Sequence, residues 1–332
     1  MDRQSELIFE KHTDFILGEA TAFFGTSPDK LERLGSFESV VYEYEKDKKR
    51  YILKITHSLH RSTEEVQGEL EWNRYLAEGG VEVSPAVRSQ YGRLVERVEV
   101  EDSYFLVYAF EKARGNPPEI DNGDLGLFET WGRTLGQMHR RTKTFEPSRN
   151  IYRRKHWHEE MTMNLERYIP DSLPLVREKC GAVKKRLQEL TQDNNEYGLV
   201  HGDLHHGNFF VNNGHLTVFD FDDCLYHWFA YDIGIPLFYL LRDARIKPDD
   251  TVYALKFMTA FTDGYKRENR LEREWLELLP LFMKVREMEL YFILLELDPG
   301  EWNGWCRRYM VGRQESIEQG KPIVEIDFTR FA

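Results

Sequence analysis

The first third of the chain switches between helical and strand-like spacing of its apolar residues. Apolar positions three or four apart predict a helix, whereas runs rich in β-branched and aromatic residues predict strands. Ser62, followed three positions later by Glu65, is typical of a capping box at the start of a helix. The pattern predicts helices over residues 6–24 and 62–78 and strands over 40–44, 51–55 and 104–110.

Beyond this region the spacing is mostly helical, with one β interruption over residues 198–221. The predicted helices span residues 127–139, 161–168, 176–190, 252–266 and 272–297. The pattern therefore predicts an α+β fold of two lobes. We expect a small β-rich N-lobe over 1–111, with an N-terminal helix, an antiparallel sheet and one further helix. A larger, mostly helical C-lobe is expected over 112–332.

Charge and cysteine content narrow the possible partners. The chain has 332 residues and a formal net charge of −12, and a phosphate backbone favours a basic face, so no nucleic-acid partner is expected. Three scattered cysteines form neither a disulfide framework nor a zinc site. The first ten residues lack the apolar core of a signal peptide, and no run approaches the ~18 apolar residues of a membrane span. We expect a cytoplasmic protein with no membrane partner.

The β interruption carries the unusual chemistry. Asn213-Gly214 is a strong hairpin signal. With a two-residue or a three-residue turn, Asn208 and Asp220 are both expected at the open end of this hairpin, and Asp203 lies on the loop just before it. An amide oxygen and carboxylates that converge in this way make a site suited to Mg²⁺.

These residues carry a family resemblance. HGDLHHGN at 201–208, FDFDD at 219–223 and YDIG at 231–234 resemble the signature of the aminoglycoside phosphotransferase / choline kinase family, whose members share the two-lobed fold of protein kinases. The resemblance implies transfer of the γ-phosphoryl group of ATP, with Mg²⁺ as cofactor, to a hydroxyl of a small-molecule substrate. It leaves open whether the acceptor is of amino alcohol, sugar or aminoglycoside type.

The resemblance also implies roles for the C-lobe residues. Asp203 resembles the catalytic base that orients the substrate hydroxyl, and Asn208 and Asp220 resemble the metal ligands. Asp222 and Asp223 are both candidates for a contact with a second ion.

Residues 201–208 resemble the catalytic loop of the family, and a further group is expected to support this loop. Asp232 resembles the buried carboxylate that braces this loop, acting through His201. His139 matches a helix-end residue of the family, for which packing is expected rather than catalysis.

In the N-lobe, Lys54 has the position of the strand lysine that contacts the α- and β-phosphates. Its expected partner is a glutamate of the following helix. Glu69 is the first choice and Glu65, four residues earlier on the same face, is the alternative.

The resemblance places the rest of the nucleotide site on two other segments. Gly35 and Ser36 belong to the phosphate-covering loop, which lacks the repeated glycines of protein kinases. Tyr108 and Phe110 belong to the lobe linker, whose backbone groups are expected to contact adenine.

Other functions remain open at this point. The histidine-rich segment also suggests a transition-metal hydrolase, in which zinc activates water and the ligands would be His201, Asp203, His205, His206 and Asp220. Two further alternatives keep the kinase fold: a catalytically inactive nucleotide-binding module, and a Ser/Thr protein kinase of the bacterial stress-response type.

Overall fold

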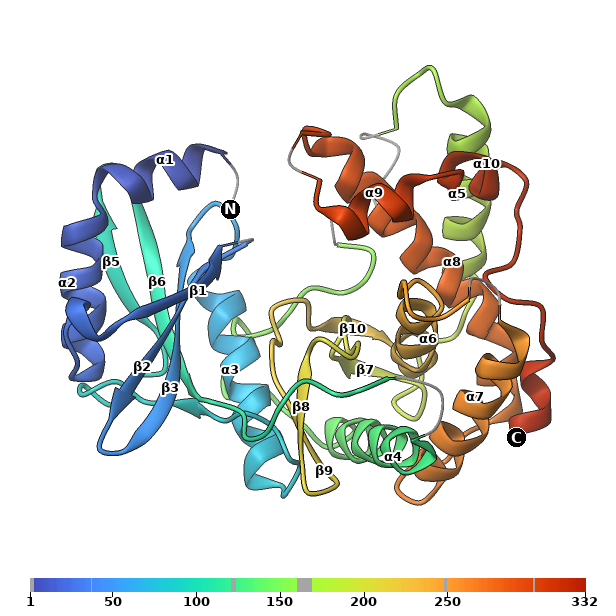
Figure 1. The fold of residues 1–332 in the computed structure, drawn as a ribbon, viewed down its shortest axis with the longest axis horizontal. Coiled ribbons are helices and arrows are strands. Elements are labelled where there is room, and N and C mark those ends of the chain that lie inside the picture. Colours follow the sequence, from blue (N-terminus) through green and yellow to red (C-terminus); the bar gives the residue numbers. More distant parts are fainter. Residues whose placement is uncertain (1–2, 37, 121–123, 160–168, 248–249, 301) are drawn as a thin grey trace. The chain divides into compact units, whose positions relative to one another are not determined.

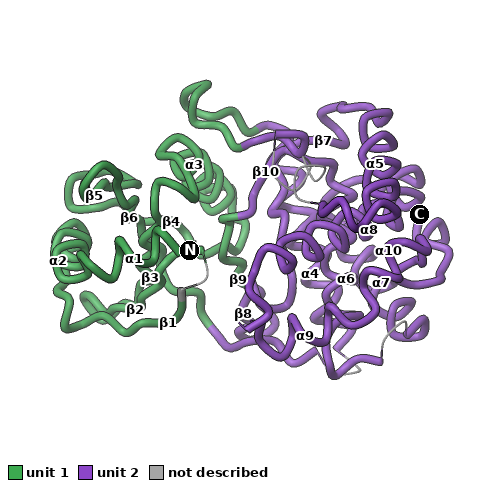
Figure 2. Tube along the Cα trace, turned by 90° about the horizontal axis from the view of Figure 1, so that it is seen from above, with its two compact units in different colours: residues 1–114, 145–154, 217–222 green, residues 115–144, 155–216, 223–332 purple. Residues whose placement is uncertain are grey.

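The computed structural model describes residues 3–36, 38–120, 124–159, 169–247, 250–300 and 302–332. The chain divides into two compact units (Figure 2). Unit 1 comprises Met1–Arg114, Phe145–Arg154 and Thr217–Asp222, and unit 2 comprises Gly115–Thr144, Lys155–Leu216 and Asp223–Ala332. The predicted division into lobes at residue 111 stays a prediction, and the helix predicted over 161–168 lies outside the described residues.

Unit 1 contains an antiparallel sheet with helices on both faces (Figure 1). The strand order is β1-β2-β3-β6-β4, and β5 pairs with β6. Its helices are α1 (Arg3–Lys11), α2 (Thr13–Phe24), the 3₁₀ helix η1 (Pro28–Lys30) and α3 (Thr63–Glu78), and its strands are β1 (Glu32–Ser36), β2 (Val40–Lys46), β3 (Lys49–His57), β4 (Ala86–Val87), β5 (Glu96–Val100) and β6 (Ser103–Glu111).

Side chains of successive strand residues point to opposite faces, so the sheet separates two cores. One face of β6 packs with α1 and α2: Phe105 and Val107 share a core cluster with Phe9 and Ile16. The other face packs against α3. Its cluster is Val66, Leu70, Ala86, Leu94, Leu106, Tyr108 and Phe110. The predicted strand pair and the capping box of Ser62 and Glu65 at α3 are confirmed.

Two local predictions differ from the structure. The predicted helix over 6–24 is two helices, because His12 leaves the helical conformation and the Thr13 hydroxyl donates a hydrogen bond to the Phe9 carbonyl at 2.7 Å. The strands predicted over 40–44 and 51–55 are longer in the structure, because the turn between β2 and β3 is only Asp47 and Lys48, both with positive φ. This conformation matches the sheet twist, so the strands continue up to the turn.

Unit 2 is mostly helical. Its helices are α4 (Leu125–Thr142), α5 (Pro174–Gln188), α6 (Phe229–Leu240), α7 (Thr251–Lys266), α8 (Arg273–Glu296), α9 (Gly304–Met310), α10 (Arg313–Glu318) and the 3₁₀ helix η3 (Phe328–Phe331). The chain's remaining strands are β7 (Tyr197–Val200), β8 (Phe209–Asn212), β9 (His215–Val218) and β10 (Leu225–Trp228). The division between the units falls within β9.

The α+β fold class is confirmed, and so are the helices that α4, α5, α7 and α8 form. The pattern missed α6, all of whose residues are buried, since a helix that is apolar all round shows no periodicity. Two residues separate β8 from β9, and Asn213 and Gly214 have φ of 51° and 81°. The two-residue alternative for the turn is therefore correct. Among the described residues, no helix is long and apolar enough to cross a membrane.

Candidate active site

Lys54 lies on β3, opposite Tyr108 of β6, and on the sheet face that α3 covers. The lysine is buried, and its Nζ donates a hydrogen bond to Oδ1 of Asp220 at 2.9 Å. Burial alone would lower the pKa of Lys54, but the negative charge of Asp220 and the groups beside it raise that pKa well above its ordinary value. Lys54 is therefore a fixed, permanently charged cation.

The two glutamates predicted as partners of Lys54 have different surroundings. Glu65 accepts a hydrogen bond from the Ser62 backbone at 2.9 Å as part of the helix cap. Glu69 is fully buried, and neither of its carboxylate oxygens has a hydrogen-bond partner within the described chain. Burial and the nearby charge of Asp222 raise the pKa of Glu69 to about 7. The structure gives Lys54 a bond to Asp220, and its pairing with Glu69 stays a prediction.

The segment that carries Asp220 is held by buried groups of unit 1. Asp220 itself adopts a positive φ of 65°, a conformation that non-glycine residues rarely take. Two residues later, the backbone carbonyl of Asp222 accepts hydrogen bonds from the guanidinium groups of Arg61 and Arg154. These two arginines fix the backbone next to the predicted metal ligand.

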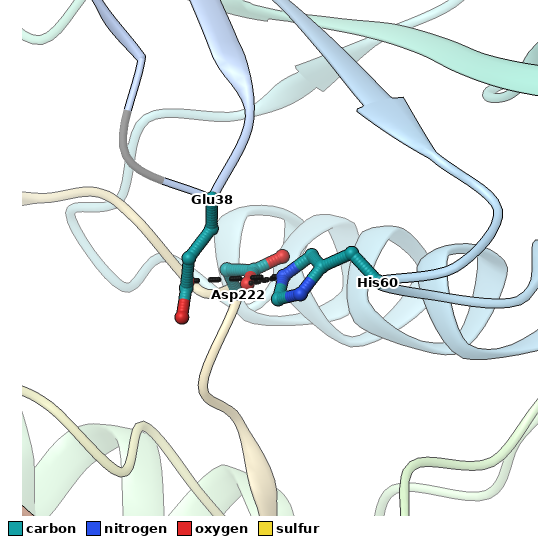
Figure 3. A group of neighbouring side chains, drawn as sticks. All are labelled: Glu38, His60 and Asp222. Atoms are coloured by element: carbon teal, nitrogen blue, oxygen red, sulfur yellow. Dashed lines mark hydrogen bonds and ion pairs between the residues drawn. The ribbon is translucent and has the colours of Figure 1, made fainter. Parts of the chain in front are cut away.

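The Asp222 side chain belongs to a group with His60 and Glu38 (Figure 3). His60 Nε2 lies 2.8 Å from Asp222 Oδ2 and 3.8 Å from Glu38 Oε2. One nitrogen and two carboxylates are possible ligands for a cation. The hydrogen bond between His60 and Asp222 uses the same nitrogen that a metal would need. Sequence reasoning missed His60 and Glu38, because neither stands in a motif.

In unit 2, the side chain of Asp232 on α6 supports the catalytic loop by binding the backbone of that loop. Its two carboxylate oxygens accept hydrogen bonds from the amides of His201 and Gly202, both at 2.8 Å, and His139 Nε2 lies 3.2 Å away. Gly202 has φ of 80°, and a Cβ there would lie 2.4 Å from the Asp223 carbonyl oxygen, so only glycine fits. His139 is thus part of the support as well as of the packing.

The Asp203 carboxylate is surrounded by donors. Arg286 of α8 donates to its Oδ1, and Asn208 Nδ2 donates to its Oδ2 at 3.2 Å and to its backbone carbonyl at 2.9 Å. His205 Nε2 lies 3.4 Å from Oδ2. Burial alone would raise the pKa of Asp203, but Arg286 and His205 hold it well below its usual range. Asp203 is an ionised acceptor, and Arg286 was missed by sequence reasoning.

The structure brings Asp203 and Asn208 together. Because the Asn208 amide nitrogen bonds Asp203, the amide oxygen is the atom that can bind a cation. Asp220 belongs to unit 1 and Asn208 to unit 2, so their joint role as ligands stays a prediction.

The other predicted nucleotide residues lie on unit 1 strands. Gly35 and Ser36 end β1, opposite Val41 and Val40. Tyr108 and Phe110 of β6 have buried side chains, so only their backbone groups suit contacts with a base. These nucleotide contacts stay predictions.

Comparison with known proteins shows which family this site belongs to. The model of the phosphotransferase enzyme family matches residues 30–275. The chain belongs to this family. It is 37% identical over 321 residues to amicoumacin kinase of Bacillus subtilis (strain 168), covering 96% of each chain.

Solved structures of kinases also resemble this chain. Amicoumacin kinase hAmiN, in complex with AMP-PNP, Ca²⁺ and Ami, has a TM-score of 0.93 and 34% identity over 100% of both chains. A microcompartment-associated aminopropanol kinase has a TM-score of 0.72 at 22% identity, covering 92% of this chain and 96% of its own. At 22% identity, the likeness to the aminopropanol kinase shows a shared fold.

The fold is therefore kinase-like, and the chain is an ATP-dependent small-molecule phosphotransferase. The hydrolase, the inactive binding module and the protein kinase are not favoured.

Proposed function

We propose that this chain transfers the γ-phosphoryl group of Mg-ATP to a hydroxyl of amicoumacin or a close chemical relative. The observation that carries the proposal is the extent of the similarity. Both amicoumacin kinases are more than 30% identical to this chain, and the alignments cover 96% and 100% of it, including the helical region after residue 275 that the family model leaves unmatched.

In the proposed reaction, Asp203 accepts a hydrogen bond from the acceptor hydroxyl and orients it. The acceptor oxygen forms a bond to the γ-phosphorus as the bond between that phosphorus and the bridging oxygen of ADP breaks. The hydroxyl proton is taken up at the Asp203 carboxylate. The contacts of His201 and Asp232 keep this loop in place, so that catalysis is mostly a matter of positioning.

The nucleotide is assigned to the residues of unit 1. Lys54 binds the α- and β-phosphates, and its raised pKa keeps it charged throughout the working pH range. Gly35 and Ser36 cover the phosphates, and the backbone at Tyr108 and Phe110 binds adenine.

The residues present fit a hard divalent cation, which we take to be Mg²⁺. The Asp220 carboxylate is half exposed, and the Asn208 amide oxygen is directed by the bonds of its own nitrogen. Oxygen ligands of this kind suit Mg²⁺. When bound, the cation offsets the negative charge of the phosphates.

The test is a transfer assay with amicoumacin, ATP and MgCl₂. We expect ADP release together with a mass increase of one phosphate on amicoumacin, and loss of both with EDTA. Choline, 1-amino-2-propanol and spectinomycin serve as comparison acceptors. Phosphorylation of one of these, with amicoumacin left unmodified, would contradict the proposed acceptor.

A further inference from the structure

Arg286 of α8 lies in unit 2, 83 positions after Asp203 in the sequence, and its guanidinium reaches the Asp203 carboxylate. The same group donates to the Tyr239 hydroxyl at 2.8 Å and to Glu289 Oε2 at 3.4 Å. Asp223 Oδ2 lies 4.0 Å away. A single buried cation therefore connects the catalytic loop to α6 and α8.

The surroundings of Arg286 leave it little freedom. Its side chain is 8% exposed, and a buried charge is tolerated only when it is paired. The guanidinium carbon lies 5.5 Å from the centre of the Tyr239 ring. Glu289, which shares the cation, accepts a hydrogen bond from Tyr231 at 2.6 Å. A planar group held on several sides fixes the orientation of whatever carboxylate it binds.

This fixed contact separates the two oxygens of Asp203. Oδ1 is bound by Arg286, whereas Oδ2 is the oxygen on the side of Asn208 and His205. Because Asn208 is a predicted metal ligand, Oδ2 is the oxygen beside that ligand.

We infer that Arg286 is a positioning residue of the transfer reaction: by binding Oδ1 it holds the carboxylate so that Oδ2 receives the acceptor hydroxyl. The inference rests on the proposed role of Asp203. Arg286 touches neither substrate in this account and acts through Asp203. Its loss frees the carboxylate to rotate, so the turnover rate falls while nucleotide binding, assigned to unit 1, is kept.

The chain offers a matched control in Arg313 of α10. Arg313 is buried to the same degree as Arg286, and it donates to the buried carboxylate of Glu287 at 2.5 Å. No contact of Arg313 reaches Asp203 in the described part of the chain. Its removal takes the cation from a buried glutamate that keeps a second donor, Lys284. Removal of Arg286 does the same to Glu289, which keeps Tyr231, but only the Arg313 change leaves the catalytic loop alone.

The experiment compares Arg286→Met, Arg286→Lys and Arg313→Met in the full chain, with thermal melting recorded for each. We expect Arg286→Met to lower kcat about 100-fold, the size typical of a misplaced catalytic group, with KM for ATP unchanged. Arg286→Lys keeps the positive charge but not the planar guanidinium, so its kcat should lie between those of wild type and Arg286→Met. Arg313→Met should lower the melting temperature while the folded enzyme keeps kcat within about 3-fold of wild type.

A second measurement separates positioning from general damage. In an Asp203→Asn background, Arg286→Met should lower kcat no further, because the carboxylate that Arg286 positions is already absent and the effects of residues that act together are not additive. An independent, multiplicative loss in this background, or equal kcat for the Arg286→Met and Arg313→Met proteins, would overturn the inference.

The wild-type assay keeps the two proposals distinguishable. If wild type phosphorylates a comparison acceptor and not amicoumacin, the acceptor assignment fails, and the Arg286 variants are measured on that other acceptor. If wild type transfers phosphate to none of them, both proposals fail.

Discussion

Each unit holds one site carboxylate in an ion pair with a buried cation, but the two pairs are built differently. In unit 1, Lys54 makes a single hydrogen bond to Asp220, whose side chain is 49% exposed. In unit 2, Arg286 binds Asp203, whose side chain is 18% exposed and has further polar neighbours. An exposed carboxylate with one partner can exchange that partner for another cation at little cost.

A carboxylate inside a buried network has no such freedom, because breaking one contact leaves other buried groups unpaired. The difference matches the two proposed duties. Asp220 has to bind and release a metal–nucleotide complex in every cycle, whereas Asp203 has to present one oxygen in one orientation. Removing the side chains of one unit at a time separates these two duties.

The largest effect is expected from Asp232→Ala. Both carboxylate oxygens of Asp232 bind the backbone of the catalytic loop from a fully buried position, and removing one partner of such a group costs about 3–5 kcal/mol. Thermal melting and urea unfolding measure the loss. The control is Asp250→Ala, which removes the N-cap of α7 and should cost about 1 kcal/mol. Equal losses for the two proteins would contradict the supporting role.

The next effect concerns unit 1. Lys54→Ala should raise KM for ATP about 10- to 100-fold, since a hydrogen bond to a charged group contributes about 1.5–3 kcal/mol. The control is Lys112→Ala, which removes a partly buried lysine that pairs with Glu43 in the same unit. An early melting transition with full turnover in the folded fraction would make Lys54 structural instead.

A smaller, pH-dependent effect is expected from Glu69→Gln. The folded pKa of Glu69 is raised to about 7, above its ordinary 4.5. Its stabilising contribution is therefore present below pH 4.5 and is lost as the pH rises through 7. The stability advantage of the Gln variant over wild type should grow by on the order of 2 kcal/mol from pH 5 to pH 8. Melting curves at the two pH values measure it, and a gain that shrinks with pH would contradict the raised pKa.

The site motifs could be predicted because they are local in sequence. Asp203 and Asn208 lie in one short loop, and Asn213-Gly214 specifies the turn that follows. The capping box of Ser62 and Glu65 was likewise visible in four residues. These features depend on residues only a few positions apart, so they can be recognised from the sequence alone.

The contacts between distant segments could not be predicted. Arg286 stands on a long helix whose pattern does not distinguish a buried arginine from an exposed one. Its partner lies 83 positions away, and no principle of local spacing links them. Arg154 and His60 meet the Asp222 segment in the same way. The fully buried α6 was missed because it shows no polar face.

A paired Mg²⁺ titration of Asp203→Asn and Asp220→Asn tests the separate duties of the two carboxylates. Each protein is assayed for Mg-ATP affinity and for turnover at every Mg²⁺ concentration. Asp203→Asn should keep the affinity and lose about 10²–10⁴-fold in kcat at all concentrations. Asp220→Asn should lose affinity and recover part of its turnover at high Mg²⁺. Rescue of Asp203→Asn by Mg²⁺, or the same response from both proteins, would contradict the separate duties of the two carboxylates.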